Sequence, residues 1–239
     1  MRTLLTCLLF VSAAGCTDLQ SSDLKTAGMS TTMSVTGDGT GQTTVTAQWN
    51  VDDNGTDFVN LSSGDTAIAK VAALSQTMSE SNALGDISYQ TSFTGQDSGG
   101  TVYTIALMRT SDVSAPSSVV TMPSPFTITT PTSSSSFSRQ TGDIVVVYSN
   151  AGSPGDTMSW SVSGICVNGS ASGVASGDTG TFTIAHGSLV PPDGGGTGGT
   201  CQATLTMTRA QYGTVDPNYG SGGSIVAQHV RSVEFNSVP

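Results

Sequence analysis

The chain has 239 residues, of which only 10% are charged, and its formal net charge is −10 at pH 7. Ser and Thr make up about 30% of the sequence, so hydroxyl groups rather than ion pairs keep it in solution. The seven basic residues provide no positive patch for phosphates, which excludes nucleic acid as a partner. The Val, Ile and Thr content favours β-structure over disorder.

The first sixteen residues have the layout of a secretory signal. One basic residue precedes an apolar run over residues 4–11, which is too short to span a bilayer. The following AAGC, residues 13–16, resembles the lipobox of bacterial lipoproteins. This resemblance implies that residues 1–15 are removed and that Cys16 carries the lipid. A plain signal-peptidase cut after residue 13 or 14 is the alternative.

The residue that follows Cys16 indicates where the protein is sorted. Thr17 follows Cys16, whereas Asp at this place is the inner-membrane retention signal of the lipoproteins that the chain resembles. We therefore expect a protein that is lipid-anchored in the outer membrane, facing the periplasm or exposed at the surface. The polar segment 16–28 lacks periodicity and is predicted to be a lipidated tether.

Two cysteines remain after export, Cys166 and Cys201. An oxidising compartment permits a disulfide between them, and the pair lacks the CxxC spacing or the neighbouring His residues of a zinc site. We predict a disulfide, with two metal-binding thiolates as the alternative.

Beyond residue 28, apolar and polar residues alternate with the period of β-strands, as in residues 45–51 and 144–148. Only residues 67–78 have weak helical character, and they could equally form a strand and a loop. Sliding the chain against itself shows a duplication. TVTAQWNV matches DIVVVYSN at an offset of 99, TIALMR matches TLTMTR at 100, and residues 58–61 match 157–160 at 99. The Pro- and Ser-rich segment 129–136 lies between the two copies, so we predict domains over 29–130 and 131–239.

Each copy holds about seven short strands, a number that packs as two antiparallel sheets face to face. The chain thus resembles the tandem immunoglobulin-like or fibronectin type III β-sandwiches of bacterial surfaces. This resemblance implies an all-β fold of two sandwich domains behind a lipoprotein signal peptide. It also implies a structural or protein-binding role, such as adhesion, with an unknown protein or glycan partner.

Two short motifs resemble those of proteases. The sequence DSGG at residues 97–100 is similar to the nucleophile loop of chymotrypsin-like enzymes, but His186 and His229 both follow it, which is the wrong order. The sequence DTGT at residues 178–181 is similar to an aspartic protease motif, but no apolar strand precedes it. We therefore predict that the protein is not an enzyme.

One acidic loop is a candidate cation site. Asp52, Asp53 and Asp57 follow a predicted strand, and oxygen-rich loops suit Ca²⁺. A plain turn is the alternative, because Asp and Asn cluster in turns for local reasons. No other cofactor is expected.

Two further features are candidates for ligand binding. Arg109 and Arg209 match across the duplication on the parity of apolar residues, and they either cap the sandwich interior or bind an anion. The loop 210–223 carries polar and aromatic residues that could bind a ligand, which makes a carbohydrate-binding module the alternative function. The candidate residues of this loop are Tyr212, Asp216, Asn218 and Tyr219.

Overall fold

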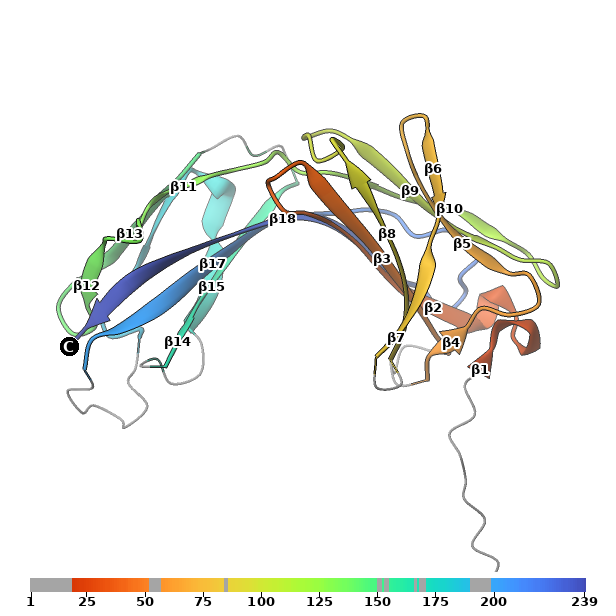
Figure 1. Ribbon diagram of the computed structural model, residues 1–239, viewed down its shortest axis with the longest axis horizontal. Helices are drawn as coiled ribbons and strands as arrows, with labels where there is room; N and C mark the ends of the chain where they lie inside the picture. Colours follow the sequence, from red (N-terminus) through yellow and green to blue (C-terminus); the bar gives the residue numbers. More distant parts are fainter. Residues whose placement is uncertain are drawn as a thin grey trace, which may run out of the picture.

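The computed structural model describes residues 19–51, 57–83, 86–149, 152, 155–165, 167, 171–189 and 199–239. Within these ranges the regular structure is β-strand except for three 3₁₀ turns, η1 (Ser21–Asp23), η2 (Thr26–Gly28) and η3 (Ser176–Asp178). No helix in the described part could cross a membrane. The strands build two β-sandwich lobes that form an arch (Figure 1), which confirms the predicted all-β sandwich fold.

One sheet runs through both lobes, and we name it the shared sheet. Its strand order is β15-β14-β17-β18-β2-β3-β8-β7, and β12 pairs with β18. Lobe 2 contributes β12 (Ser136–Ser138), β14 (Thr157–Gly164), β15 (Ala171–Ala175), β17 (Cys201–Tyr212) and β18 (Gly223–Val238). Lobe 1 contributes β2 (Met29–Gly37), β3 (Gln42–Val51), β7 (Ser79–Ala83) and β8 (Asp86–Thr94).

A smaller second sheet completes each lobe. In lobe 1 it is formed by β5 (Thr66–Val71), β6 (Leu74–Thr77), β9 (Val102–Met108) and β10 (Ala115–Thr121). In lobe 2 it is formed by β11 (Ile128–Thr130), β13 (Ile144–Tyr148) and β16 (Thr181–Ile184). Ile225 of β18 belongs to the lobe 1 core and Phe235 of the same strand to the lobe 2 core. Since both have odd numbers in one strand, the two cores lie on the same face of the shared sheet.

The two lobes have the same topology. In the described part of each lobe, the first, second and fifth main strands form one sheet, and the third, fourth, sixth and seventh form the other. This arrangement resembles a fibronectin type III sandwich. In this topology β3 of lobe 1 is the counterpart of β13 of lobe 2, and β9 is the counterpart of β17. These equivalences agree with two of the three sequence matches. The lobes differ in which of their two sheets joins the shared sheet.

One expectation about local structure is corrected, and one alternative that the sequence left open is decided. Val59 lies in β4 (Val59–Asn60), which pairs with β1 (Leu19–Gln20), whereas its sequence match Met158 lies in β14, the counterpart of β5. The segment with weak helical character forms β5 and β6. Ala67, Ala69 and Val71 are buried at alternate positions, so the period of two dominates over the helical propensity of alanine.

The expected tether is also shorter than predicted. From Leu19 onward the chain packs against lobe 1, and Ser21 and Thr26 are buried. The guanidinium of Arg109 donates to the carbonyl oxygens of Ser21, at 2.6 Å, and Leu24, at 3.1 Å. These bonds satisfy backbone groups that a free tether would leave to water.

A hairpin of lobe 2 inserts into lobe 1. The end of β17, the following loop and the start of β18, residues 210–229, form this docking hairpin. Its β18 part pairs in parallel with β2, from Gly223 opposite Thr31 to His229 opposite Gly37. Its loop forms a bridge between Thr214 and Val119 of β10. The hairpin thus joins both sheets of lobe 1 along one edge.

Two glycines allow the hairpin to approach so closely. A Cβ on Gly213 would collide with the carbonyl oxygen of Val119, and one on Gly220 with that of Ala27. Tyr219 enters the lobe 1 core, where Trp49 Nε1 donates to its hydroxyl at 2.8 Å. The predicted division at residue 130 therefore differs from the packing, because part of the second sequence copy completes the first core.

The Trp49–Tyr219 bond can be tested by Tyr219→Phe. The substitution leaves the buried indole N–H without an acceptor, which we expect to lower the free energy of unfolding by about 1–3 kcal/mol. Tyr212→Phe is the matched control, since this ring is 69% exposed and should change stability by less than about 0.5 kcal/mol. Urea unfolding curves provide the measurement. Equal effects of the two variants would contradict the importance of the bond.

Candidate functional site

Three of the four candidate residues of the 210–223 loop, Asp216, Asn218 and Tyr219, hold the docking hairpin in place. Asp216 is buried, and its Oδ2 accepts hydrogen bonds from the backbone and hydroxyl of Ser117 at 2.8 and 2.6 Å. Asn218 Nδ2 donates to the carbonyl of Ser114 at 2.8 Å. Tyr219 is 4% exposed and Tyr212 projects alone at the end of β17. Because the Tyr219 ring is buried in lobe 1, the two tyrosines do not form a joint surface on which a sugar could stack.

The pKa of Asp216 reflects this environment. Burial raises the pKa of the carboxyl, but the hydrogen bonds from Ser117 and Asn218 outweigh burial, so the pKa lies below its ordinary value. Asp216 is thus ionised in the interface and bonded to backbone amides, which is a structural role.

Arg109 closes the interior of lobe 1. Its Nε lies 2.6 Å from Oδ2 of Asp65, and both side chains are fully buried. Asp65 also accepts hydrogen bonds from Ser21 Oγ and from the backbone of Thr110, each at 2.8 Å. Burial raises the pKa of Asp65, but these hydrogen bonds and the Arg109 charge lower it by more. The pKa therefore lies below its ordinary value. Arg109 is a cap of the core rather than an exposed anion site.

Arg209 repeats this arrangement at the junction of the lobes. Its Nε lies 2.7 Å from Oδ2 of Asp178, and its NH1 donates to the carbonyl of Ser124 at 2.9 Å. The guanidinium carbon stands 5.1 Å from the centre of the Phe126 ring. Arg209 therefore binds the segment between the lobes, and it is a structural cap like Arg109.

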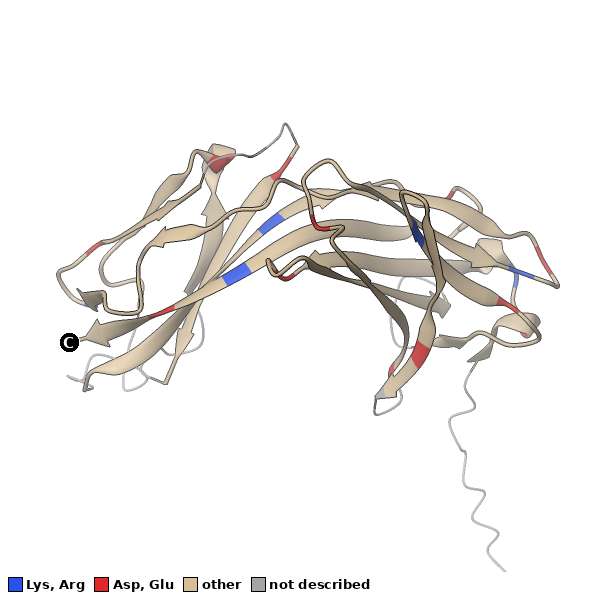
Figure 2. Ribbon diagram, turned by 45° about the horizontal axis from the view of Figure 1, so that its top comes forward, with Lys and Arg blue, Asp and Glu red and all other residues tan. Residues whose placement is uncertain are grey.

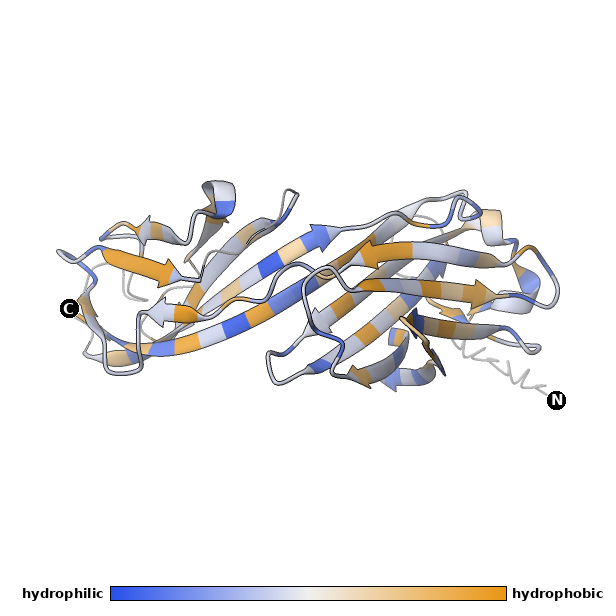
Figure 3. Cartoon of the chain, turned by 90° about the horizontal axis from the view of Figure 1, so that it is seen from above, coloured by the Kyte–Doolittle hydropathy of each residue, from blue (hydrophilic) through white to orange (hydrophobic). Residues whose placement is uncertain are grey.

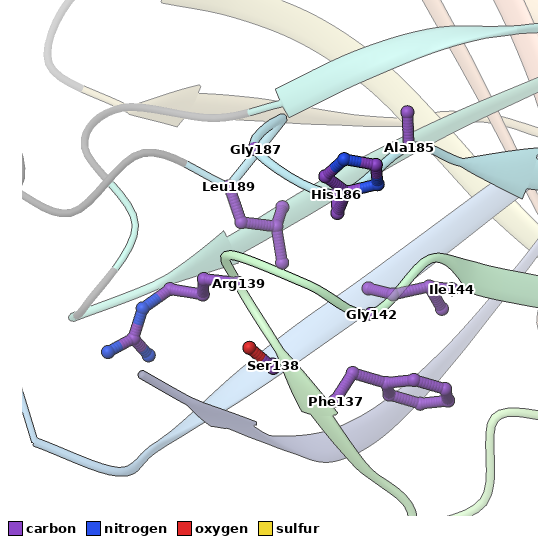
Figure 4. Close-up of a pocket in the computed structure, with 9 residues that line it drawn as sticks. All are labelled: Phe137, Ser138, Arg139, Gly142, Ile144, Ala185, His186, Gly187 and Leu189. Atoms are coloured by element: carbon purple, nitrogen blue, oxygen red, sulfur yellow. The ribbon is translucent and has the colours of Figure 1, made fainter.

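His186 lines a small cavity in lobe 2 (Figure 4) and forms a pair with Asp143. Nδ1 of His186 lies 2.7 Å from Oδ1 of Asp143, as in a catalytic triad. The hydroxyl of Ser138, in the same cavity, donates to the carbonyl of Pro239 at 3.0 Å and accepts from the amides of Gln140 and Thr141. Because its hydroxyl is bonded elsewhere, Ser138 is not aligned as a nucleophile for this pair.

The candidate metal and disulfide residues lie partly outside the described ranges. Asp52 and Asp53 are outside them, and Asp57 is exposed. Among the described residues there is no group of three or more metal-binding side chains. Cys201 begins β17, whereas Cys166 is not described, so the disulfide stays a prediction. The β14–β17 register ends with Gly164 opposite Ala203, and each cysteine is two residues beyond this pair.

The outer face of the shared sheet has an unusual composition. Hydrophobic and hydrophilic residues alternate along its strands (Figure 3), so one side chain in two points away from the cores. Acidic residues lie mainly in turns and at strand ends (Figure 2). On the central strands Glu234 is the one charged side chain among the described outward residues. The exposed or half-buried hydroxyls that the central strands β14, β17, β18, β2 and β3 present on this face are those of Thr32, Ser34, Thr36, Thr44, Thr46, Thr157, Ser159, Ser161, Ser163, Thr204, Thr206, Thr208, Ser224 and Ser232.

A shallow depression marks the lobe 2 end of this face. It has a volume of about 390 Å³ and lies over β14, β15 and β17. The hydroxyls of Ser159, Ser161, Ser172, Thr206 and Thr208 line it. In a chain with a net charge of −10, this surface suits an uncharged polar partner because no strong field surrounds it.

The two arginines were predictable from the sequence as caps of the sandwich interior, but the particular aspartates that pair with them were not. Asp65 precedes β5 and Asp178 precedes β16, so the two aspartates are not matched by the duplication offset. The parity of the arginines indicated burial, and a buried guanidinium requires a carboxylate or carbonyls. The role of Tyr219 carried no such signal, because its partner is 170 residues away.

A scan of protein families and a search of curated proteins find no match to this chain. Among solved structures, it is similar to the FN1–FN3 domains of chicken CNTN1, at 9% identity and a TM-score of 0.27, over 87% of this chain and 66% of that one. It is similar to the titin fragment A168169 at 12% identity and a TM-score of 0.26, over 87% and 96% of the two chains.

An enzyme is also among these structures. The cycloalternan-degrading enzyme of Trueperella pyogenes is similar at 12% identity and a TM-score of 0.29, over 81% of this chain and 33% of that one. The chain thus spans less than two thirds of the CNTN1 chain and one third of the enzyme. At such TM-scores these likenesses carry no argument about function.

The buried Arg109–Asp65 pair yields a stability prediction. Asp65→Asn leaves an uncompensated guanidinium in the core, and we expect the free energy of unfolding to fall by about 3–5 kcal/mol. Lys25→Ala is the control, since this ammonium is 81% exposed beside Asp112 and should change stability by less than about 1 kcal/mol. Chemical unfolding at pH 7 measures both.

Acid titration provides a second readout of the same pair. Because folding lowers the pKa of Asp65, its contribution is present above the unfolded value of about 3.9 and is lost as pH falls through the folded value. Asp65→Asn should therefore show a weaker loss of stability below about pH 4. An unchanged acid slope would contradict the assignment.

Proposed function

We propose that the protein is a non-enzymatic lipoprotein of the bacterial cell envelope, anchored in the outer membrane through Cys16, with a structural or protein-binding role. The observation that carries this proposal is the shared sheet, which joins both lobes into one arch and presents one nearly uncharged face. The predicted adhesion-type role fits this architecture, because sandwich domains in tandem hold a binding surface away from a membrane.

The geometry supports a rigid support rather than two domains on a linker. The docking hairpin pairs with β2 over residues 223–229 and reaches β10 through Thr214. Arg209 also fastens the segment between the lobes at Ser124. Bending of the arch would require breaking these bonds together, so a partner on the shared face meets a preformed surface.

The Asp–His pair does not form a triad with the serine of its cavity. His186 has an orienting carboxylate, but the hydroxyl of Ser138 donates to Pro239 instead of to the imidazole. General-base activation needs the hydroxyl proton within hydrogen-bond reach of the imidazole. The cavity is therefore better explained as local packing of the β12–β13 segment.

A carbohydrate-binding module is the second candidate, at a different place from the sequence prediction. The hydroxyl-lined depression over β14, β15 and β17 could accept a neutral sugar through hydrogen bonds. Trp160 is half-buried and stacks on Phe182, with ring centres 5.7 Å apart. It therefore presents little aromatic surface to a sugar, which favours the protein partner.

Photo-crosslinking in the source cells tests the shared face. A photo-reactive residue at Ser232 or Thr44, both exposed on this face, should give a discrete protein adduct. The matched control is Thr183, which is exposed on the other sheet of lobe 2 and should give at least about fivefold less. Equal adducts from all three positions, or none from Ser232 and Thr44, would contradict a protein-binding face. Retention of these same variants on neutral polysaccharide beads would instead support the second candidate.

The anchor is tested separately by Cys16→Ser. The wild-type protein should incorporate labelled palmitate and sediment with the outer membrane, because acyl chains add about 0.8 kcal/mol of membrane affinity per methylene. The variant should lose the label and appear in the soluble fraction. Unchanged membrane sedimentation of unlabelled Cys16→Ser would exclude the lipid anchor. The expected disulfide is left intact by this change.

A further inference from the structure

His229 lies where β18 passes from lobe 1 to lobe 2. It ends the parallel pairing with β2, opposite Gly37, and on its other side it faces Arg209 of β17. Its side chain is 0% exposed. A Cβ on Gly37 would come within 2.6 Å of the ring nitrogen Nδ1, so glycine at this position leaves the space that the imidazole fills.

The ring is poorly prepared to hold a positive charge. Its Nε2 is buried without a well-aligned hydrogen-bond partner among the described residues, and the backbone of Gly37 and Pro123 near the ring compensates it only in part. On the other side of the ring, NH2 of Arg231 lies 3.5 Å from Nδ1. A guanidinium only donates hydrogen bonds, so the neutral ring carries its proton on Nε2 and turns Nδ1 toward Arg231. A second proton would go onto Nδ1, directly beside this cation, which is costly in a buried site.

The other charged groups around the ring do not neutralise the positive charge that protonation of His229 would add. Across the sheet, Arg209 adds a cation, but its charge is paired with Asp178. None of the ion pairs in the described part of the chain includes His229 or Arg231. The carboxylates that act on the two are Asp97, between β8 and β9, and Asp38, in the turn after β2, which acts on Arg231.

Together these effects lower the pKa of His229. Burial lowers the pKa of His229 and the Arg231 charge lowers it further, while Asp97 and the backbone of Gly37 and Pro123 oppose this only in part. The folded state therefore binds its proton less readily than the unfolded chain. Above the unfolded pKa of about 6.5 the ring is neutral in both states and costs the folded state nothing. As pH falls below that value the unfolded chain takes up the proton more readily, so the free energy of unfolding decreases.

We propose that His229 makes the joint between the lobes sensitive to mild acid: its protonation weakens the pairing of β18 with β2 and withdraws the docking hairpin from lobe 1. This inference goes beyond the proposed function and does not depend on any partner. The hairpin carries Tyr219 into the lobe 1 core against Trp49, so withdrawal would expose the indole. The rest of lobe 2 keeps its own core around Phe235 and Met207.

The two histidines of the chain provide a matched comparison. His186 is 57% exposed and pairs with Asp143, and it follows β16 of lobe 2 in the cavity beside Ser138 and Leu189 (Figure 4). The carboxylates with lowered pKa, such as Asp65 and Asp216, titrate below about pH 4. A window from pH 7.5 to 5 therefore isolates histidine protonation.

The experiment follows thermal unfolding and tryptophan emission of the purified protein across this window. Trp160→Phe serves as the background, so that Trp49 alone reports on the hairpin. We expect Tm to fall by roughly 3–5 °C between pH 7.5 and 5, together with a red shift of Trp49 emission. His186→Gln should show the same fall and the same shift.

Replacement of His229 should remove both effects. His229→Gln keeps a neutral polar side chain and His229→Met keeps an apolar one of similar size, so the pair guards against one variant failing to fold. Each should change Tm by less than about 1 °C across the window. A wild-type Tm that is flat from pH 7.5 to 5, or a fall that persists in either folded His229 variant, would overturn the proposal.

Discussion

The sixteen-residue strand β18 is the element on which the rest of the molecule depends. Its second half completes lobe 2 beside β17, and its first half forms a parallel edge for β2. A strand in this position has to satisfy two cores at once, and it does so because its odd residues point inward over its whole length. The arch follows from this single continuous register (Figure 1).

Because the two lobes are joined through β18, the duplicated halves are not two independent domains. Both lobes have the same strand order, but lobe 1 contributes its first, second and fifth strands to the shared sheet and lobe 2 contributes the opposite set. The last strand of lobe 2 can therefore lie beside the first strand of lobe 1. This removes two exposed strand edges that would otherwise be open to aggregation, and it leaves one broad hydroxyl-bearing face.

The few charges of the chain are placed where the fold closes. Arg109 with Asp65 and Arg209 with Asp178 are buried pairs at equivalent ends of β9 and β17. Each guanidinium also binds carbonyl oxygens of segments that enter its lobe. Such a pair contributes little net stability when formed and costs much when one partner is lost, so its effect is to specify one arrangement of the entering chain.

The amino-acid pattern was sufficient for the class of fold, because alternation with a period of two and a repeat near 100 residues are local properties of the chain. It also located Arg109 and Arg209 inside, since their parity matched that of Leu107 and Met207. The partners of these arginines, the burial of Tyr219 and the place of His229 depend on contacts between residues far apart in the chain. Trp49 and Tyr219 are 170 positions apart, and no periodicity links them. Their contact arises from the packing of a hairpin against a lobe that the chain built earlier, and pairing between distant strands is set by shape and register rather than by neighbouring residues.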